Sequence, residues 1–230
     1  ASVSLRISGS HLNKVRLSKI DPSNWQDHAH IGTGDECYFL REYTKGQGYG
    51  FSDTNQLIFN LKKPMEGRGR MGWRYKGEAI GQCASEMKGA LNPDWLTSVV
   101  LIPVPPSKSR DDPAYDNRMH QVCELIEPGG GTRDLVVQHG STRASHACEE
   151  GERVSVDELK ALYRIDEALA GPSPALIGIV DDVVTAGTHF RAMSDVLSAR
   201  FPDVPITGLF VARRVFPDIS FEDFGFQPAK

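Results

Sequence analysis

The second half of the chain alternates short apolar runs with segments whose apolar positions follow helical spacing. Continuous apolar runs at 99–102 and 175–180 are typical of strands that are buried on both faces. Further strands are predicted over 135–137 and 206–212, and helices over 115–126, 155–169 and 188–200. Ser155 followed by Glu158 fits a capping box that opens the second of these helices. Strands that alternate with helices predict an α/β fold with a parallel sheet and right-handed crossovers.

The first third of the chain has a less regular pattern. Strands are expected over 36–43 and 56–61, separated by the glycine-rich segment 45–50. Four Lys and Arg residues lie among glycines in 62–72, which indicates an exposed loop, and a helix over 73–91 carries an apolar stripe that includes Ile80, Ala84 and Met87. We therefore expect an N-terminal α+β extension or hood over 1–96, whose helix packs on an α/β core over 97–230.

Composition narrows the class of protein without indicating a function. The 230 residues are 40% hydrophobic and 24% charged, as in ordinary globular proteins, and the formal net charge of −4 argues against a surface that is basic throughout, as in a nucleic-acid-binding protein. The apolar runs are far shorter than the roughly 18 residues of a membrane span, and residues 1–10 lack the apolar core of a signal peptide. The four cysteines (Cys37, Cys83, Cys123 and Cys148) are far apart and do not have the spacing of a zinc site, so we expect a reduced, cytoplasmic protein.

The strongest chemical signal follows the strand at 175–180, where two carboxylates precede a tight turn and a helix. Ligands of parallel sheets bind beyond the carboxyl ends of the strands. The turn places backbone N–H groups and threonine hydroxyls at a helix N-terminus, which favours an anion, and Gly187 can adopt a positive φ that lets a phosphate approach. Asp181 and Asp182 can accept hydrogen bonds from a vicinal diol and help to hold a divalent cation.

A pair of adjacent aspartates alone would fit a solvated strand end, followed by an ordinary strand-to-helix connection. The full pattern is more specific and resembles the ribose-5-phosphate-binding signature of type I phosphoribosyltransferases, which bind phosphoribosyl pyrophosphate. The resemblance implies that Asp181 and Asp182 are catalytic and hold Mg²⁺. It also implies that the 5′-phosphate is bound by six consecutive residues: Val184, Thr185, Ala186, Gly187, Thr188 and His189. Thr-Ala-Gly-Thr is similar to the orotate-type variant of the motif, whereas His189 departs from the usual Thr or Ser.

Two further segments fit the same resemblance, which covers about 97–213. Pro106, Ser107 and Lys108 follow the strand at 99–102 and correspond to the family's pyrophosphate loop; the alternative is a proline-rich turn with a solvated base. The long polar segment around Arg143 and Arg153 corresponds to the family's lid, and a solvated loop is the alternative there. The order of these motifs, together with Arg118 and Gln121, is most similar to competence-associated phosphoribosyltransferase-like proteins.

The resemblance implies that pyrophosphate at C1 of the sugar is displaced by a nitrogen nucleophile. Thr185 stands where purine-salvage members often carry a carboxylate, which argues against a 6-oxopurine acceptor. The family usually builds its acceptor pocket from a hood outside the sheet, which would be residues 35–75 here. Aromatic residues there that could stack on a base, although a core role is the alternative, are Tyr38, Tyr43, Tyr49, Phe51 and Trp73. His28 and His30 form an H-x-H pair that we expect in a surface loop rather than at a metal.

Two other functions stay open from the sequence. A nucleotide-sensing or regulatory module could keep the pocket and lack transfer, and a nucleoside- or nucleotide-cleaving effector of a bacterial defence system could use it with water or phosphate as acceptor. The expected partner is a small-molecule substrate, either phosphoribosyl pyrophosphate or a nucleotide, with no membrane. A homodimer and a protein or nucleic-acid partner also stay open.

Overall fold

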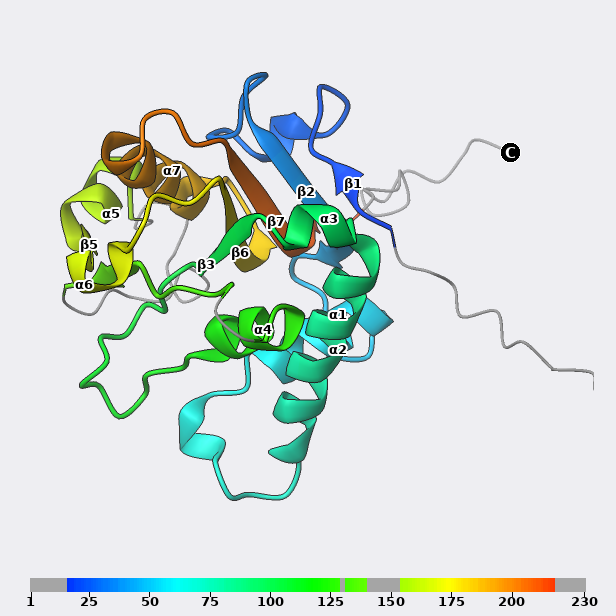
Figure 1. The fold of residues 1–230 in the computed structure, drawn as a ribbon. Helices are drawn as coiled ribbons and strands as arrows, with labels where there is room; N and C mark the ends of the chain where they lie inside the picture. Colours follow the sequence, from blue (N-terminus) through cyan, green and yellow to red (C-terminus); the bar gives the residue numbers. More distant parts are fainter. Residues whose placement is uncertain (1–15, 129–130, 140–153, 218–230) are drawn as a thin grey trace, which may run out of the picture.

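The computed structural model describes residues 16–128, 131–139 and 154–217. Its main sheet has five strands in the order β1-β2-β7-β6-β3 (Figure 1). The strands are β1 (Ser18–Lys19), β2 (Glu36–Thr44), β7 (Ile206–Val215), β6 (Leu176–Val184) and β3 (Val99–Pro103). Only β1 is antiparallel to its neighbour, and the other adjacent pairs are parallel. The expected α/β architecture with a mainly parallel sheet is confirmed.

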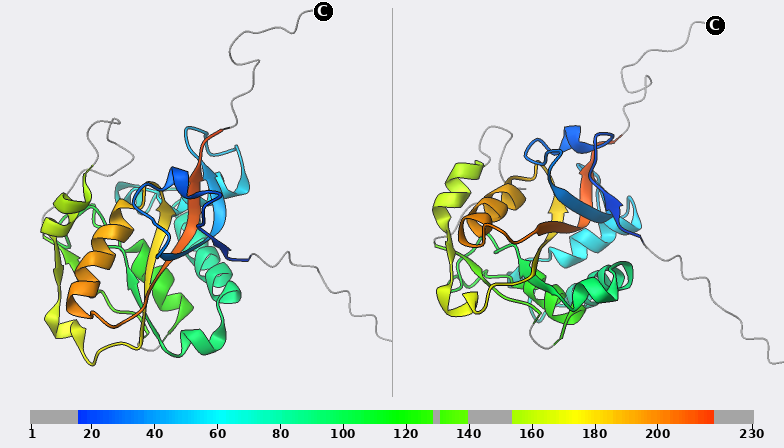
Figure 2. Two further views of the ribbon diagram at one scale, coloured as in Figure 1. Left: turned by 90° about the horizontal axis from the view of Figure 1, so that it is seen from above. Right: turned by 45° about the horizontal axis from the view of Figure 1, so that its top comes forward.

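Helices cover both faces of this sheet (Figure 2). One face carries α1 (Asp53–Leu61), α2 (Arg74–Ala90) and α4 (Arg118–Ile126), and the other carries α5 (Val156–Leu162) and α7 (Thr188–Arg200). The shorter elements are α3 (Pro93–Leu96), α6 (Glu167–Ala170) and the 3-10 turns Trp25–Asp27 and Met65–Gly67. A separate two-stranded antiparallel sheet consists of β4 (Val136–Gln138) and β5 (Tyr163–Ile165), so the strand expected at 135–137 lies outside the main sheet. No helix within the described ranges is both long and apolar enough to cross a membrane.

Strand β3 shows why its sequence is apolar without interruption. Val99 and Leu101 pack into the cluster with α1, α2 and α4, whereas Val100 and Ile102 pack into the cluster with α5 and α7. Successive side chains of a strand point to opposite faces, so a strand that is covered on both sides needs apolar residues at every position. Cys83 and Cys123 are fully buried and are small residues of the core.

The first third of the chain shares this sheet and its core. Strand β2 pairs with β7 from Glu36 opposite Thr207 to Thr44 opposite Val215, and α1 and α2 pack on the same face as α4. The helix expected at 73–91 is confirmed as α2. The hood at 35–75 was expected outside the sheet, but its strand lies in the sheet between β1 and β7.

The strand predicted over 56–61 is wrong, because these residues form most of α1. The Ser52 side chain caps this helix by accepting the backbone N–H of Asn55, and Leu57, Ile58 and Leu61 share its buried face. The buried Asn55 side chain also binds the backbone at the end of β2 and just after it, donating to the Thr44 and Gln47 carbonyls at 3.1 and 3.2 Å. Four of the residues 56–61 are apolar (Leu57, Ile58, Phe59 and Leu61), and so short a pattern has no clear period, so the upstream cap decides its structure.

The helix predicted over 155–169 is interrupted. The capping box of Ser155 and Glu158 is present, but α5 ends at Leu162 and the chain continues as β5 before α6 begins. Tyr163 is almost fully buried in β5, where its backbone pairs with Gln138. Burial of this large side chain and pairing with β4 override the local helical pattern.

Candidate functional site

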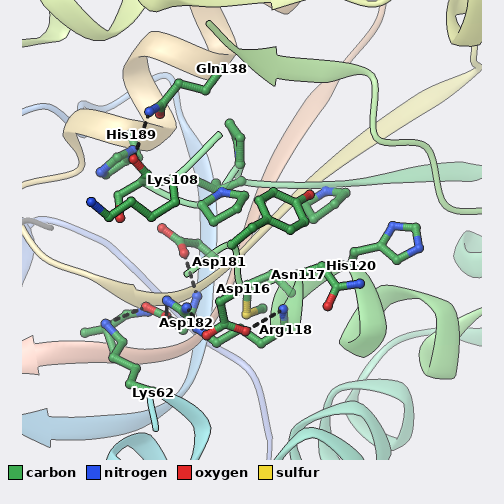
Figure 3. A pocket seen from close by; sticks show the side chains of 18 of the residues that line it. Lys62, Lys108, Asp116, Asn117, Arg118, His120, Gln138, Asp181, Asp182 and His189 are labelled. Atoms are coloured by element: carbon green, nitrogen blue, oxygen red, sulfur yellow. Dashed lines mark hydrogen bonds and ion pairs between the residues drawn. The ribbon is translucent and has the colours of Figure 1, made fainter. Parts of the chain in front are cut away.

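A cleft of about 1620 Å³ lies where the carboxyl ends of β3 and β6 meet α1, α4 and the start of α7 (Figure 3). It brings together most of the residues that the sequence predicted for the site. Those that line it are Pro106, Ser107, Lys108, Asp181, Asp182, Thr185, Ala186, Thr188 and His189. Val184 and Gly187 are buried beside these residues and shape the turn without lining the cleft. The two predicted lid residues, Arg143 and Arg153, lie outside the described residues.

The turn between β6 and α7 depends on a glycine. Gly187 has φ +84°, a conformation that side-chain-bearing residues rarely adopt, and it is the N-cap of α7. A Cβ atom there would lie 2.7 Å from the side chain of Ile31. Because the N-cap has no side chain, the first N–H groups of α7 are not capped from that position, and an anion can accept hydrogen bonds from such groups.

The N-terminal segment holds this turn from behind. The ring Nδ1 of His28 is hydrogen-bonded to the Thr185 carbonyl, and the backbone N–H of His30 donates to the Ala186 carbonyl at 2.8 Å. In a trans peptide the N–H points opposite to the C=O, so the N–H groups of Ala186 and Gly187 point away from this segment. The turn therefore presents two backbone donors on the side opposite to its supports.

His28 is fully buried, so the expectation that it lies in a surface loop is wrong. Burial lowers the pKa of His28, with the Thr185 carbonyl opposing that shift. A neutral ring that is bonded to a carbonyl carries its proton on Nδ1 and donates it. His28 therefore supports the turn.

His189 lies at the start of α7 and is hydrogen-bonded through Nδ1 to the hydroxyl of Tyr163 at 2.7 Å. Burial lowers the pKa of His189 to about 4, although nearby Asp182 opposes this. Burial also raises the pKa of the Tyr163 hydroxyl well above its ordinary value. Both groups are neutral at pH 7, so His189 offers the cleft a polar ring without a charge.

The two adjacent aspartates have different surroundings. Asp182 is 4% exposed, and its carboxylate accepts hydrogen bonds from Nε and Nη2 of Arg118 at 3.0 and 2.6 Å. Lys62 Nζ lies 2.9 Å from the other carboxylate oxygen. Burial would raise the pKa of Asp182, but Lys62 and Arg118 outweigh it and hold this pKa far below its ordinary value. Asp182 is thus a charged anchor for two cations.

Asp181 is half-buried and lines the cleft, and one of its oxygens accepts the backbone N–H of Asp182 at 2.7 Å. Burial and the negative charge of Asp182 raise the pKa of the Asp181 carboxyl. A ligand that supplies hydroxyl donors or a cation would relieve this cost of ionisation. Of the two aspartates, Asp181 is therefore the one suited to contact a ligand.

The ion pairs continue away from the cleft. Arg118 also binds Asp116 at 2.9 Å, and Asp116 binds Lys76 of α2 at 2.7 Å. Lys76 is 3% exposed and donates a further hydrogen bond to the Leu61 carbonyl at 2.7 Å. A chain of alternating charges thus joins α2, α4, β6 and the end of α1, and it fixes the position of Arg118.

Residues that were not predicted as site residues supply these cations. Arg118 belongs to the motif at 117–121, but its pairing with Asp182 requires the packing of α4 against the sheet. Lys62 follows α1, and the segment before it was predicted as a strand. Reading Ser52 as a helix cap was the signal that could have placed Lys62 at a helix end.

Mg²⁺ is the cofactor that the family resemblance implies. Within the described ranges, no three His, Cys, Asp or Glu residues gather to hold a metal ion. Asp182 is already bonded to two protein cations, whereas Asp181 contributes a single carboxylate to the cleft wall. Mg²⁺ is commonly held by one or two carboxylates and the phosphates of a substrate, so Asp181 fits a shared site of that kind. The metal roles of Asp181 and Asp182 stay predictions.

The segment after β3 also lines the cleft. It is tied to the sheet where the Val104 N–H donates to the Val180 carbonyl at 2.9 Å, and Gln138 Nε2 donates to the Ser107 carbonyl at 3.2 Å. Lys108 lies 3.9 Å from Asp112, a long and partly exposed ion pair that leaves its ammonium close to the cleft. The position of this segment agrees with its predicted place at the same sheet edge as Asp181.

Of the aromatic residues considered for stacking, Tyr43 and Tyr49 line the cleft. Tyr38 instead donates a hydrogen bond from its hydroxyl to Glu36 on the sheet.

Searches against protein-family models and against curated proteins found no match to this chain.

Proposed function

We propose that this cleft binds phosphoribosyl pyrophosphate or a nucleotide 5′-phosphate and transfers the phosphoribosyl group to a nitrogen acceptor. The proposal includes a fold of the type I phosphoribosyltransferase kind. The observation that carries it is the glycine turn at the start of α7, which shares one cleft with Asp181 and with the segment after β3. A helix N-terminus suits a phosphate, and the nearby carboxylate suits a sugar diol.

In this proposal the 5′-phosphate binds at the turn, where Thr185 and Thr188 add hydroxyl donors to those of the backbone. Asp181 accepts hydrogen bonds from the ribose hydroxyls. Asp182 acts indirectly, because its carboxylate positions Lys62 and Arg118 at the wall of the cleft. Lys108 and the backbone around Ser107 bind the pyrophosphate, whose several negative charges favour cationic and N–H donors.

The reaction needs little covalent participation by the protein. The lone pair of the acceptor nitrogen forms a bond to C1, the bond from C1 to the pyrophosphate oxygen breaks, and its electron pair leaves with pyrophosphate. The nitrogen loses a proton as the product forms. Mg²⁺ would supply charge neutralisation to the leaving pyrophosphate, and the residues of the cleft supply orientation and exclude water.

The test is release of pyrophosphate from phosphoribosyl pyrophosphate with Mg²⁺ and a panel of bases and amines. We expect release with at least one acceptor and a large loss in Asp181→Asn. Asp203→Asn is the matched control, since Asp203 is exposed beyond the C-terminal end of α7, outside the cleft. No release with any acceptor, alongside tight binding of a nucleotide, would favour the sensing module; release of a free base from a nucleotide would favour the cleaving effector.

A further inference from the structure

A histidine–carboxylate pair lines the cleft and has no role in the site as described so far. His120 Nδ1 lies 2.8 Å from Asp134 Oδ1, and both residues line the cleft. His120 is in the first turn of α4, and Asp134 lies two residues before β4. The two side chains are 32% and 25% exposed, so they are accessible to a ligand and partly shielded from water.

Asp134 is itself held in place from the other side. Its second oxygen accepts a hydrogen bond from Arg110 Nη2 at 3.1 Å. Since a carboxylate only accepts hydrogen bonds, Nδ1 of His120 carries the proton in this pair. In the neutral ring, Nε2 is then a lone-pair acceptor, and among the described residues it has no hydrogen-bond partner. An imidazole oriented by a carboxylate with its other nitrogen available has the arrangement of a general base.

The position of the pair fits the acceptor side of the proposed reaction. In the view of Figure 3, His189 and Lys108 lie at one end of the drawn residues, His120 at the other, and Asp181 between them. Lys108 and His189, two of the residues proposed to bind pyrophosphate and phosphate, therefore lie away from His120. A nucleophile near His120 would approach the sugar from that other end of the cleft.

We propose that His120 is the general base of the transfer and that Asp134 is its positioning residue, an inference that rests on the proposed function. As the acceptor nitrogen bonds to C1 and pyrophosphate leaves with the electron pair of the broken C1–O bond, the proton of that nitrogen passes to Nε2 of His120. The imidazolium is stabilised by Asp134 and later releases its proton to solvent. The acceptor is accordingly a neutral amine or N–H heterocycle that must lose a proton to complete the reaction.

Several charged groups lie around His120. Asp134 contacts it, Arg110 contacts Asp134, Glu124 lies one helical turn further along α4, and Asp111, Asp116 and Arg118 line the same cleft. Asp116 and Arg118 are paired with each other. Asp134 is thus the charged group in direct contact with the His120 ring, and its removal tests the pair most directly.

The experiment measures the rate of pyrophosphate release against pH for the parent, His120→Gln and Asp134→Asn, and their binding of phosphoribosyl pyrophosphate by calorimetry. We expect His120→Gln to bind phosphoribosyl pyrophosphate within about twofold of the parent, to lose about 10²–10⁴-fold in rate, and to lose the rise of rate with pH. Asp134→Asn should keep that rise but shift it to lower pH, because the imidazolium loses its carboxylate.

A merely structural role predicts a different pattern. If both variants keep the parent's pH profile and rate, or lose binding and rate together, the general-base assignment is wrong while the proposed function stands. If the parent itself releases no pyrophosphate with any acceptor, the proposed function fails and the assignment fails with it. Gln121→Ala is a control on the same helix, with an exposed side chain that, among the described residues, bonds only to Asn117.

Discussion

Replacing Gly187 with alanine tests the turn on which the phosphate site is built. The change adds one methyl group at a residue with φ +84°, and that group would lie 2.7 and 3.2 Å from two side-chain carbons of Ile31. Ile31 is 6% exposed, packs in the core beside α7, and follows His30, whose N–H binds the turn. The added methyl group therefore has no open space on that side.

Two costs combine in this variant. A residue with a side chain is less stable in the left-handed conformation than in its ordinary conformations by about 1–2 kcal/mol. Forcing a methyl group into a packed core costs a further ~1–3 kcal/mol. We therefore expect Gly187→Ala to lower the free energy of unfolding by about 2–5 kcal/mol, a large part of the roughly 5–15 kcal/mol of a typical domain.

Urea unfolding at pH 7 measures this loss, and two further variants make it specific. Gly81→Ala in α2 should stabilise the chain by up to about 1 kcal/mol, since its added Cβ meets nothing within 4 Å. The double variant Gly187→Ala with Ile31→Ala should lose less free energy of unfolding than the two single variants together. The difference should be the ~1–3 kcal/mol of crowding that the smaller side chain at position 31 relieves. A Gly187→Ala variant as stable as the parent would refute the geometry of the turn.

The remaining predictions concern the charges of the cleft. Asp182→Asn should lower the free energy of unfolding by about 3–5 kcal/mol, because it leaves Lys62 and Arg118 without their shared carboxylate. Asp181→Asn should leave the free energy of unfolding unchanged or raise it, because the variant removes a charge that burial makes costly. Urea unfolding of the two variants measures this difference. The pKa of His189, lowered to about 4 from 6.5, means that the unfolded chain binds more protons between these values. Stability should therefore fall by roughly 3 kcal/mol as pH drops from 6.5 to 4, and His189→Gln should remove that part of the pH dependence.

Much of the α/β layering could be predicted because its elements carry strong local patterns. Strand β3 and helix α7 were expected within a residue of their observed bounds, since a run buried on both faces and a stripe at helical spacing are clear signals. Helix α1 was missed because the four apolar residues of 56–61 fit either period. The place of β2 beside β7 was missed because pairing between residues about 170 positions apart leaves no local pattern.

The candidate site divides in the same way. Asp181 and the turn are contiguous in sequence, so their chemistry could be predicted together. Their supports are not contiguous: His28 reaches the Thr185 carbonyl from 157 residues away, and Arg118 reaches Asp182 from 64. The pairing of His120 with Asp134 likewise exists only once α4 and the segment before β4 are packed.

Direct titration of the protein with phosphoribosyl pyrophosphate and Mg²⁺ in a calorimeter tests the central claim most directly. The account predicts saturable binding at one site per chain, weakened at least tenfold in Asp181→Asn and unchanged in Asp203→Asn. Absence of binding by the parent, or equal binding by Asp181→Asn and the parent, would contradict the assignment of this cleft.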